Sequence, residues 1–210
     1  MRTTAKICGL STPATLDSAI ASGASHVGFV HFAPSPRHVD LARLAGLAAR
    51  VPARVARVGV LVDPDDAQVE SIAPFVDVLQ LHKVAPDRAA AIRARSGREI
   101  WAAVPVKTRG DLDAAVPYHG AADLIVYDAK TPDSAALPGG MGLRFDWALL
   151  DRFRHPLPWA LSGGLDADAV GEAITRTGAR LVDVSSGVES APGVKDVDKI
   201  AAFLQAVARC

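Results

Sequence analysis

Short apolar runs alternate with amphipathic segments along almost the whole chain. Eight runs rich in Val and Ile have the pattern of strands, at residues 5–9, 26–31, 57–62, 76–81, 99–106, 123–127, 159–162 and 181–185. The segments between them have the pattern of helices that begin near Pro13, Asp40, Asp65, Asp87, Arg109, Phe145, Asp166 and Asp196. Several of these starts are Asp, whose carboxylate caps or favours a helix N-terminus. The pattern therefore predicts a regular alternation of strands and helices.

The number and character of the strands favour a closed sheet. Strands that are apolar on both faces and alternate with helices are typical of a parallel sheet covered by helices. Eight units match the α/β fold called the (β/α)₈ or TIM barrel, a parallel closed sheet surrounded by helices. A doubly wound open sheet is the alternative, but it more often stops at about five to seven strands. Because no linker or low-complexity stretch divides the sequence, we expect residues 1–210 to form a single TIM-barrel domain.

Composition limits the classes of ligand. Half of the residues are hydrophobic, and 23 Lys and Arg balance 23 Asp and Glu. With no net field to attract nucleic acid or a membrane, an anionic ligand must be held by local groups. The two cysteines are too few for a disulfide framework, no signal peptide is evident, and no run approaches the ~18 apolar residues of a membrane span. We expect a cytoplasmic protein that binds neither nucleic acid nor membranes.

Two glycine-bearing turns follow the last two predicted strands. They are the sequences Leu-Ser-Gly-Gly-Leu at residues 161–165 and Asp-Val-Ser-Ser-Gly-Val-Glu at residues 183–189. Glycine lets the backbone approach a ligand closely, and free backbone N–H groups attract anions. In a (β/α)₈ barrel the loops after the last strands frequently hold a phosphate. The two turns together therefore favour a phosphorylated small-molecule substrate.

Two side chains at strand ends are candidates for acid–base chemistry. Cys8 ends the first strand, where it is either a buried small hydrophobe or a thiolate base helped by Gly9 and by Lys6 on the same strand face. Asp128 ends the sixth strand, where it is either a loop-bracing carboxylate or an acid whose pKa is raised by desolvation. Converging from opposite sides of a barrel mouth, such a pair can remove one proton and deliver another. That is isomerase chemistry without a cofactor.

Other polar residues follow strands on the same predicted face. Arg37, in a loop stiffened by two prolines, is either an ordinary surface arginine or a group that forms a bidentate pair with a substrate carboxylate. Asp183 is either a buried acceptor of hydrogen bonds or a group that orients the substrate. The glycine run at residues 139–142 is either a plain turn or part of a phosphate cradle or lid. His82 is a candidate for lining the pocket.

Several common motifs are missing from the sequence. It contains no Walker motif, no Cys/His spacing for a metal, no Gly-x-Gly-x-x-Gly fingerprint and no Gly-x-Ser-x-Gly elbow. The sequence therefore gives no support for nucleotide hydrolysis, hydride transfer or serine acyl transfer. We expect no cofactor and no metal.

Taken in order, these segments resemble the phosphoribosylanthranilate isomerase family of tryptophan biosynthesis. The resemblance covers nearly the whole chain, and its ordered set of motifs is more specific than any single one. The motifs are Lys6-Ile7-Cys8-Gly9, Gly28-Phe29-Val30, Ser35-Pro36-Arg37, Gln80-Leu81-His82, Asp128, Gly139-Gly140-Met141-Gly142, Phe145-Asp146-Trp147, residues 161–165, residues 183–189 and Pro192-Gly193-Val194-Lys195-Asp196.

The resemblance implies a (β/α)₈ barrel that converts N-(5-phosphoribosyl)anthranilate to its 1-deoxyribulose isomer by an Amadori rearrangement. It further implies that Cys8 is the general base and Asp128 the general acid. Arg37 would hold the anthranilate carboxylate, and Asp183 would help position the substrate. Backbone amides would hold the phosphate around Gly142, Gly163, Gly164, Ser186 and Gly187. Because the base must be deprotonated while the acid is protonated, a bell-shaped pH–rate profile is expected.

The sequence departs from the family pattern at three positions, and other functions remain open. Ser162, Met141 and Lys83 stand where Ala, Ser or Thr, and Gly are common, and none of these changes removes a proposed catalytic group. The alternatives are a sibling aminoaldose phosphate isomerase, which typically has Asp where this chain has Cys8, and a non-catalytic sensor of phosphorylated ligands. A fragment of a fused pathway enzyme is a third reading, although we expect a complete barrel. A monomer or a homodimer is expected.

Overall fold

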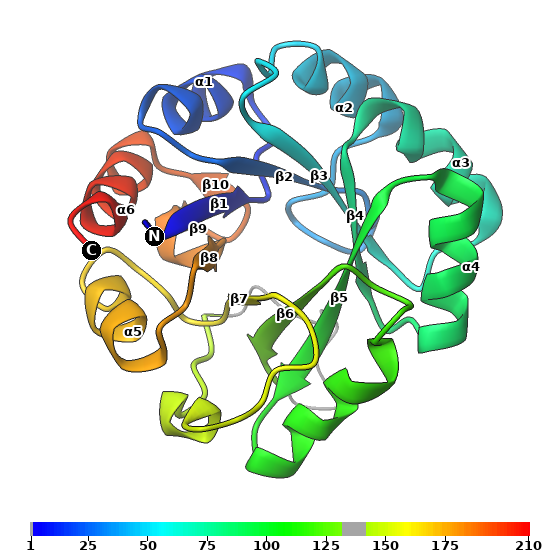
Figure 1. Cartoon of the computed structure of the whole chain (residues 1–210). Coiled ribbons are helices and arrows are strands. Elements are labelled where there is room, and N and C mark those ends of the chain that lie inside the picture. The colour runs from blue at the N-terminus through cyan, green and yellow to red at the C-terminus, as the bar shows by residue number, and fades with distance from the viewer. Residues whose placement is uncertain (1, 132–141) are drawn as a thin grey trace.

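A closed barrel of eight parallel strands forms the centre of the molecule. The computed structural model describes residues 2–131 and 142–210. Each strand pairs with its neighbour in sequence, and β1 pairs with β8 to close the sheet (Figure 1). The strands are β1 (Thr4–Cys8), β2 (His26–Val30), β3 (Ala56–Val62), β4 (Val78–His82), β5 (Glu99–Val106), β6 (Leu124–Ala129), β7 (Trp159–Leu161) and β8 (Leu181–Val184). The predicted (β/α)₈ barrel is confirmed, and the open sheet is wrong.

Helices surround the barrel, and several begin where the predicted caps stand. The α-helices are α1 (Pro13–Ala21), α2 (Leu41–Ala48), α3 (Asp66–Ile72), α4 (Pro86–Ser96), α5 (Val170–Thr177) and α6 (Val197–Ala208). Asp40, Asp65 and Asp196 each accept a hydrogen bond from a backbone N–H in the first turn of the helix that follows. These caps satisfy donors that a helix N-terminus leaves without partners.

Two of the predicted helices are 3₁₀ segments. Residues Arg109–Tyr118 (η2) and Trp147–Leu150 (η3) stand where the pattern predicted helices after β5 and β6, and a third 3₁₀ turn, Ala73–Phe75 (η1), follows α3. Pro117 lies inside η2, where it lacks the N–H that an α-helix requires. The pattern of apolar residues predicted helical segments at both places but did not distinguish the α-helical from the 3₁₀ type.

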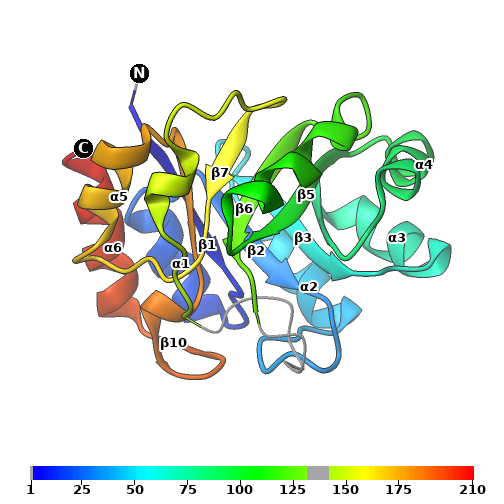
Figure 2. The same ribbon diagram turned by 90° about the horizontal axis from the view of Figure 1, so that it is seen from below.

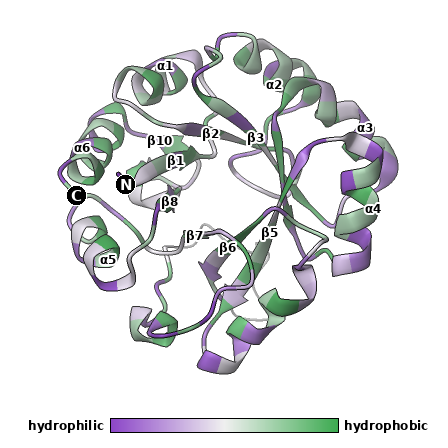
Figure 3. Cartoon of the chain, viewed as in Figure 1, coloured by the Kyte–Doolittle hydropathy of each residue, from purple (hydrophilic) through white to green (hydrophobic). Residues whose placement is uncertain are grey.

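Apolar side chains pack in two layers. One fills the barrel interior, around Val58, Trp101 and Val126, and the other lies between the strands and the helices. In Figure 3 the helices carry hydrophobic and hydrophilic residues on different sides, as amphipathic helices covering a sheet do. Trp101 is 1% exposed and is the largest fully buried side chain. The interior is therefore a packed core, and its upper layer is the floor of the site.

A small hairpin after β8 was not predicted. A 3₁₀ turn, Ser186–Val188 (η4), leads into β9 (Glu189–Ala191), which pairs antiparallel with β10 (Val194–Lys195). The hairpin lies at the edge of the barrel where the strands end, on the same side as the loop that precedes α2 (Figure 2). Among the described residues, no helix has the length and apolar character needed to cross a membrane.

Candidate active site

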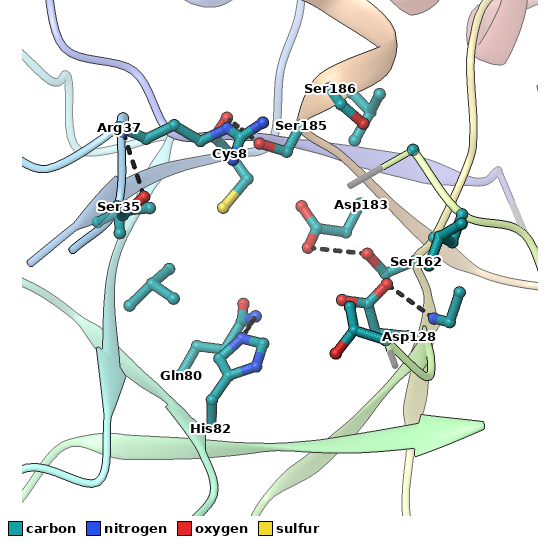
Figure 4. A pocket seen from close by; sticks show the side chains of 18 of the residues that line it. Cys8, Ser35, Arg37, Gln80, His82, Asp128, Ser162, Asp183, Ser185 and Ser186 are labelled. Atoms are coloured by element: carbon teal, nitrogen blue, oxygen red, sulfur yellow. Dashed lines mark hydrogen bonds between the residues drawn. The ribbon is translucent and has the colours of Figure 1, made fainter. Parts of the chain in front are cut away.

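A pocket of about 790 Å³, its open mouth included, lies at the C-terminal ends of the strands. Its position is the face on which (β/α)₈ barrels carry their active sites. Of the residues predicted for the site, all except Gly187 line it. The predicted residues that line it are Cys8, Arg37, Asp128, Gly142, Gly163, Gly164, Asp183 and Ser186. Figure 4 shows the pocket from close by.

Cys8 points into the pocket from the end of β1. A Cβ built on Gly28, in the adjacent strand β2, would lie 3.0 Å from both the Cys8 Sγ and the Lys6 Cε. The two side chains therefore share the inner face of β1, as their spacing predicted, and Gly28 leaves room for them. Burial raises the pKa of the Cys8 thiol, and Asp183 raises it further, while the Lys6 ammonium opposes both. The thiol is thus held mainly protonated at neutral pH.

Asp128 stands across the pocket from Cys8, at the end of β6 (Figure 4). Its side chain is 9% exposed, and its Oδ1 accepts a hydrogen bond of 2.8 Å from the backbone N–H of Ala129. Burial, followed by repulsion from Asp183, raises the pKa of Asp128 to about 7, although the Ala129 N–H and Lys6 act in the opposite direction. A carboxyl group in this state is protonated on about half of the molecules at neutral pH.

A buried ion pair lies beneath both groups. The fully buried Lys6 Nζ donates to the two carboxylate oxygens of Asp183 at 3.0 and 3.1 Å. Burial lowers the pKa of Lys6, but Asp183 and Cys8 outweigh it and the pKa is raised, so the ammonium is kept. Of the two interpretations of Asp183, the buried hydrogen-bond acceptor is confirmed. Its exposure to the pocket leaves a contact with substrate as a prediction.

The turn after β7 is shaped by two glycines with positive φ. Gly163 has φ +90° and Gly164 has φ +63°, a region that side-chain-bearing residues rarely adopt. A Cβ on Gly163 would lie 2.7 Å from the Ala129 nitrogen and 3.0 Å from the Asp128 Oδ1. Within residues 2–131 and 142–210, no acceptor bonds the backbone N–H of either glycine. This turn therefore offers amide donors at the rim of the pocket.

The turn after β8 approaches the turn after β7 closely. A Cβ on Gly187 would lie 1.9 Å from the Leu165 carbonyl oxygen, so only glycine fits there. A Cβ on Gly142 would contact the Ser186 hydroxyl at 3.6 Å, which brings a third glycine beside the same two turns. The structure thus brings the predicted glycines together. Residues 139–141 of the predicted Gly-Gly-Met-Gly run lie outside the described residues.

Arg37 is held by a carboxylate of the unpredicted hairpin. Its Nε and Nη2 donate to the two oxygens of Glu189 at 2.7 and 2.8 Å, and its backbone N–H donates to the Ser35 hydroxyl at 3.2 Å. Lys195 donates to the same Glu189 carboxylate at 2.6 Å. Burial opposes ionisation of Glu189, but its hydrogen bonds to Arg37 and Lys195 hold its pKa below the usual range.

Gln80 and His82 come from β4 and form the wall of the pocket below Cys8 (Figure 4). The Gln80 amide nitrogen lies 3.1 Å from the His82 Nε2. Burial, with Lys6 and Lys83, lowers the pKa of His82 to about 4, so the imidazole is neutral near pH 7. His82 therefore lines the pocket, as predicted, as an uncharged polar group.

Sequence reasoning gave no role to two charged residues of the site. Glu189 and Lys195 appeared only as parts of motifs, yet both are 8% exposed. Their burial depends on the β9–β10 hairpin, whose short strands carry no periodic signal. Among the described residues, no group of three His, Cys, Asp or Glu side chains could hold a metal ion.

Fold and site together define a class: a (β/α)₈ barrel with a small-molecule site, in which a thiol and a carboxyl group face each other beside amide-bearing glycine turns. The comparisons with known proteins name the family. Residues 5–206 match the family model described as N-(5'-phosphoribosyl)anthranilate (PRA) isomerase. The chain belongs to this family.

The sequence is similar to individual members of the family over nearly their full length. The N-(5'-phosphoribosyl)anthranilate isomerase of Zymomonas mobilis subsp. pomaceae is 53% identical over 205 residues, covering 96% of both chains. That of Cereibacter sphaeroides is 51% identical over 203 residues, covering 95% of this chain and 96% of the relative. A crystal structure of phosphoribosyl anthranilate isomerase from Thermotoga maritima matches this chain with a TM-score of 0.87 and 32% sequence identity. The match covers 99% of this chain and 100% of that one.

A further solved structure contains a ligand. It is a phosphoribosyl anthranilate isomerase in complex with reduced 1-(o-carboxyphenylamino)-1-deoxyribulose 5-phosphate. Its TM-score to this chain is 0.83 at 30% identity, and the match covers 99% of this chain and 100% of that one.

Proposed function

We propose that the chain catalyses the isomerisation of N-(5-phosphoribosyl)anthranilate to 1-(o-carboxyphenylamino)-1-deoxyribulose 5-phosphate, a step of tryptophan biosynthesis. The observation that carries the proposal is the pairing of Cys8 with Asp128 across one pocket, within a chain that belongs to this family. The thiol and the carboxyl group are the base and the acid that a cofactor-free aldose–ketose isomerisation needs.

The substrate carries an anion at each end, and the pocket offers a matching group for each. The amides of Gly163 and Gly164, together with the turn at Ser186 and Gly187 and the nearby Gly142, would hold the phosphate. Arg37, on the far side of the pocket beside Cys8, would hold the anthranilate carboxylate. The ribose would then span the space between Cys8 and Asp128.

The first step opens the sugar ring. Asp128, in its protonated form, donates a proton to the ribose ring oxygen, and the bond from that oxygen to C1 breaks. The lone pair of the anthranilate nitrogen forms the C1=N bond of an iminium cation. A carboxyl group with its pKa raised to about 7 suits this task, because it carries a proton near neutral pH.

The second step moves a proton from carbon. The Cys8 thiolate takes the proton from C2, the C–H electrons form a C1=C2 bond, and the C1=N electrons return to nitrogen. The enolamine then tautomerises: C1 gains a proton, the C2 hydroxyl loses one, and C2 becomes a ketone. The Lys6 ammonium and the positive iminium both favour the thiolate. Asp183 would help to orient the amine and the sugar hydroxyls.

The test follows the fluorescence of the anthranilate group when purified protein meets freshly generated substrate. Wild-type protein should accelerate the decay of the signal. Cys8→Ala and Asp128→Ala should each lower turnover by roughly 10²–10⁴-fold or more while circular dichroism shows an intact fold. Cys210→Ala is the matched control, because this exposed thiol lies outside the pocket, and it should keep full activity.

Two outcomes would overturn the proposal. If folded wild-type protein leaves the decay unchanged, the substrate is a different aminoaldose phosphate, or the chain is a sensor of such a ligand. If the wild type is active and either alanine variant keeps substantial activity, the assignment of base or acid is wrong.

A further inference from the structure

Three charged side chains form a buried cluster behind Cys8. The cluster consists of Arg37, from the loop before α2, and of Glu189 and Lys195, from the two strands of the β9–β10 hairpin. Glu189 takes two N–H donors from one edge of the Arg37 guanidinium, and its Oε1 also accepts from Lys195 at 2.6 Å. The side chains of all three are at most 6% exposed.

Hydrogen bonding identifies the protonation state of Lys195. Its Nζ donates to the Glu189 carboxylate, to the Ser185 carbonyl oxygen at 2.8 Å and to the Ser185 hydroxyl at 3.1 Å. That hydroxyl donates its own hydrogen to the Cys8 carbonyl oxygen at 3.3 Å, so it must accept from Lys195. Three acceptors match the three N–H donors of the ammonium form. Burial lowers the pKa of Lys195 and the Glu189 carboxylate opposes that shift, and the three contacts favour the positively charged form.

The hairpin is fastened to the barrel at points that fix the cluster. A Cβ on Gly193, which has φ +82°, would lie 2.5 Å from the Pro36 carbonyl oxygen, so the hairpin tip touches the Arg37 loop directly. At the base of the hairpin, Lys199 donates to the backbone carbonyl of Glu189 at 2.7 Å. A Cβ on Gly9 would lie 2.7 Å from the Arg37 Cδ, so the arginine stem packs on the backbone after β1.

The net charge of the three side chains determines how strongly the cluster attracts a carboxylate. Arg37 with Glu189 alone would sum to zero, and a neutral ion pair attracts an anion weakly. Lys195 brings the sum to +1. Removing the charge of Lys195 would leave zero, and removing the charges of both Lys195 and Glu189 would restore +1. The three side chains thus fix one edge of the guanidinium and together carry a net charge of +1.

We propose that Glu189 and Lys195 are positioning residues for the carboxylate end of the ligand: Glu189 fixes the plane of the Arg37 guanidinium, and Lys195 keeps the cluster cationic. This inference rests on the proposed function, because the ligand carboxylate is that of the anthranilate group. The cluster makes the site selective for aminoaldose phosphates whose amine substituent carries a carboxylate. In binding the carboxylate, both residues act through Arg37, and neither touches a reacting atom.

The experiment measures equilibrium binding of two probes. One is reduced 1-(o-carboxyphenylamino)-1-deoxyribulose 5-phosphate, and the other is its phenylamino counterpart without the carboxylate. Titration calorimetry at neutral pH and fixed salt compares wild type, Lys195→Met and the double variant Glu189→Gln/Lys195→Met. Binding is used in place of turnover because Lys195 also lowers the pKa of Cys8. Lys199→Met is the matched control, since the exposed Lys199 ammonium fastens the same hairpin but lies outside the cluster.

Lys195→Met should weaken binding of the carboxylate probe by roughly 10-fold or more, because a unit of charge is lost within a buried cluster. Binding of the probe without the carboxylate should stay within about 2-fold, and Lys199→Met should change neither by more than that. The double variant should recover at least part of the lost selectivity, because its cluster again sums to +1.

Three results would overturn the inference. One is an equal loss for both probes in Lys195→Met, which indicates a purely structural role. A second is a loss of affinity for the carboxylate probe in Lys199→Met as large as that in Lys195→Met. The third is a double variant that distinguishes the two probes less well than Lys195→Met does. If wild-type protein binds neither probe, the proposed function fails instead, so the two failures are distinguishable.

Discussion

The raised pKa values of Cys8 and Asp128 predict how kcat/KM depends on pH. Burial raises the pKa of Cys8 above its ordinary value and raises that of Asp128 to about 7. The proposed mechanism requires Cys8 deprotonated and Asp128 protonated, which is the reverse of the order in which the two groups lose their protons. In the singly protonated enzyme, the reactive arrangement, with the proton on Asp128 and Cys8 as thiolate, is therefore the minor one.

The direction in which kcat/KM changes in each pH range follows from the order in which Asp128 and Cys8 lose their protons. Below pH 7 Asp128 stays protonated and the thiolate fraction falls tenfold per pH unit, so kcat/KM falls. Between pH 7 and the pKa of Cys8, the loss of acid balances the gain of thiolate, and kcat/KM is level. Above the pKa of Cys8 the thiolate is complete while the acid is still being lost, so kcat/KM declines.

The assay combines kinetics with a direct titration. Profiles of kcat/KM report the free enzyme, and the ultraviolet absorbance of thiolate is measured in Cys210→Ser protein against the same protein with Cys8→Ser added. At pH 7 Cys8 should be almost entirely thiol. In Asp128→Asn the residual rate should rise with the thiolate and should not decline at high pH, since no acid remains to be lost. A Cys8 that is mostly thiolate at pH 7, or a maximum of kcat/KM below pH 7, would refute the reasoning.

Two further changes test the architecture of the site. Gly163→Ala should lower both activity and the free energy of unfolding, the latter by about 1–3 kcal/mol, because its Cβ would sit 2.7 Å from a backbone nitrogen of β6 and 3.0 Å from Asp128; Gly178→Ala, with φ +70° and nothing within 4 Å, should lose stability but no activity. Asp183→Asn should cost about 3–5 kcal/mol in urea unfolding because Lys6 loses its buried partner, and adding Lys6→Met should recover much of that loss; a double variant no more stable than the single one would contradict this.

Much of the fold could be predicted from the sequence because each strand has its own apolar run. All eight predicted strands overlap observed ones, and Cys8 and Asp128 lie at strand ends as the runs indicated. A helical segment after β5 was also predicted, but its 3₁₀ type, which Pro117 favours by lacking an N–H, was not.

The charged part of the site could not be predicted in the same way. Glu189, whose carboxylate accepts hydrogen bonds from Arg37, is 152 residues away in sequence, and no spacing rule joins the two residues. Glu189 and Lys195 belong to strands of three and two residues, too short for any alternation to appear. The sequence predicted a carboxylate-binding arginine, and that role stays a prediction. The structure adds the ion pair that orients it.

The closure of β1 against β8 has a consequence for how the protein is made. Lys6 and Asp183, the ion pair beneath the candidate acid and base, are 177 residues apart. At a synthesis rate of about 5–20 residues per second, Lys6 waits roughly 10–35 s on the ribosome before Asp183 is translated. Until residues 181–184 have been made, β1 cannot pair with β8, and Lys6 lacks its native ion-pair partner. The pocket, which Asp183 and Ser186 help to line, therefore cannot be complete until β8 and the turn after it have been translated.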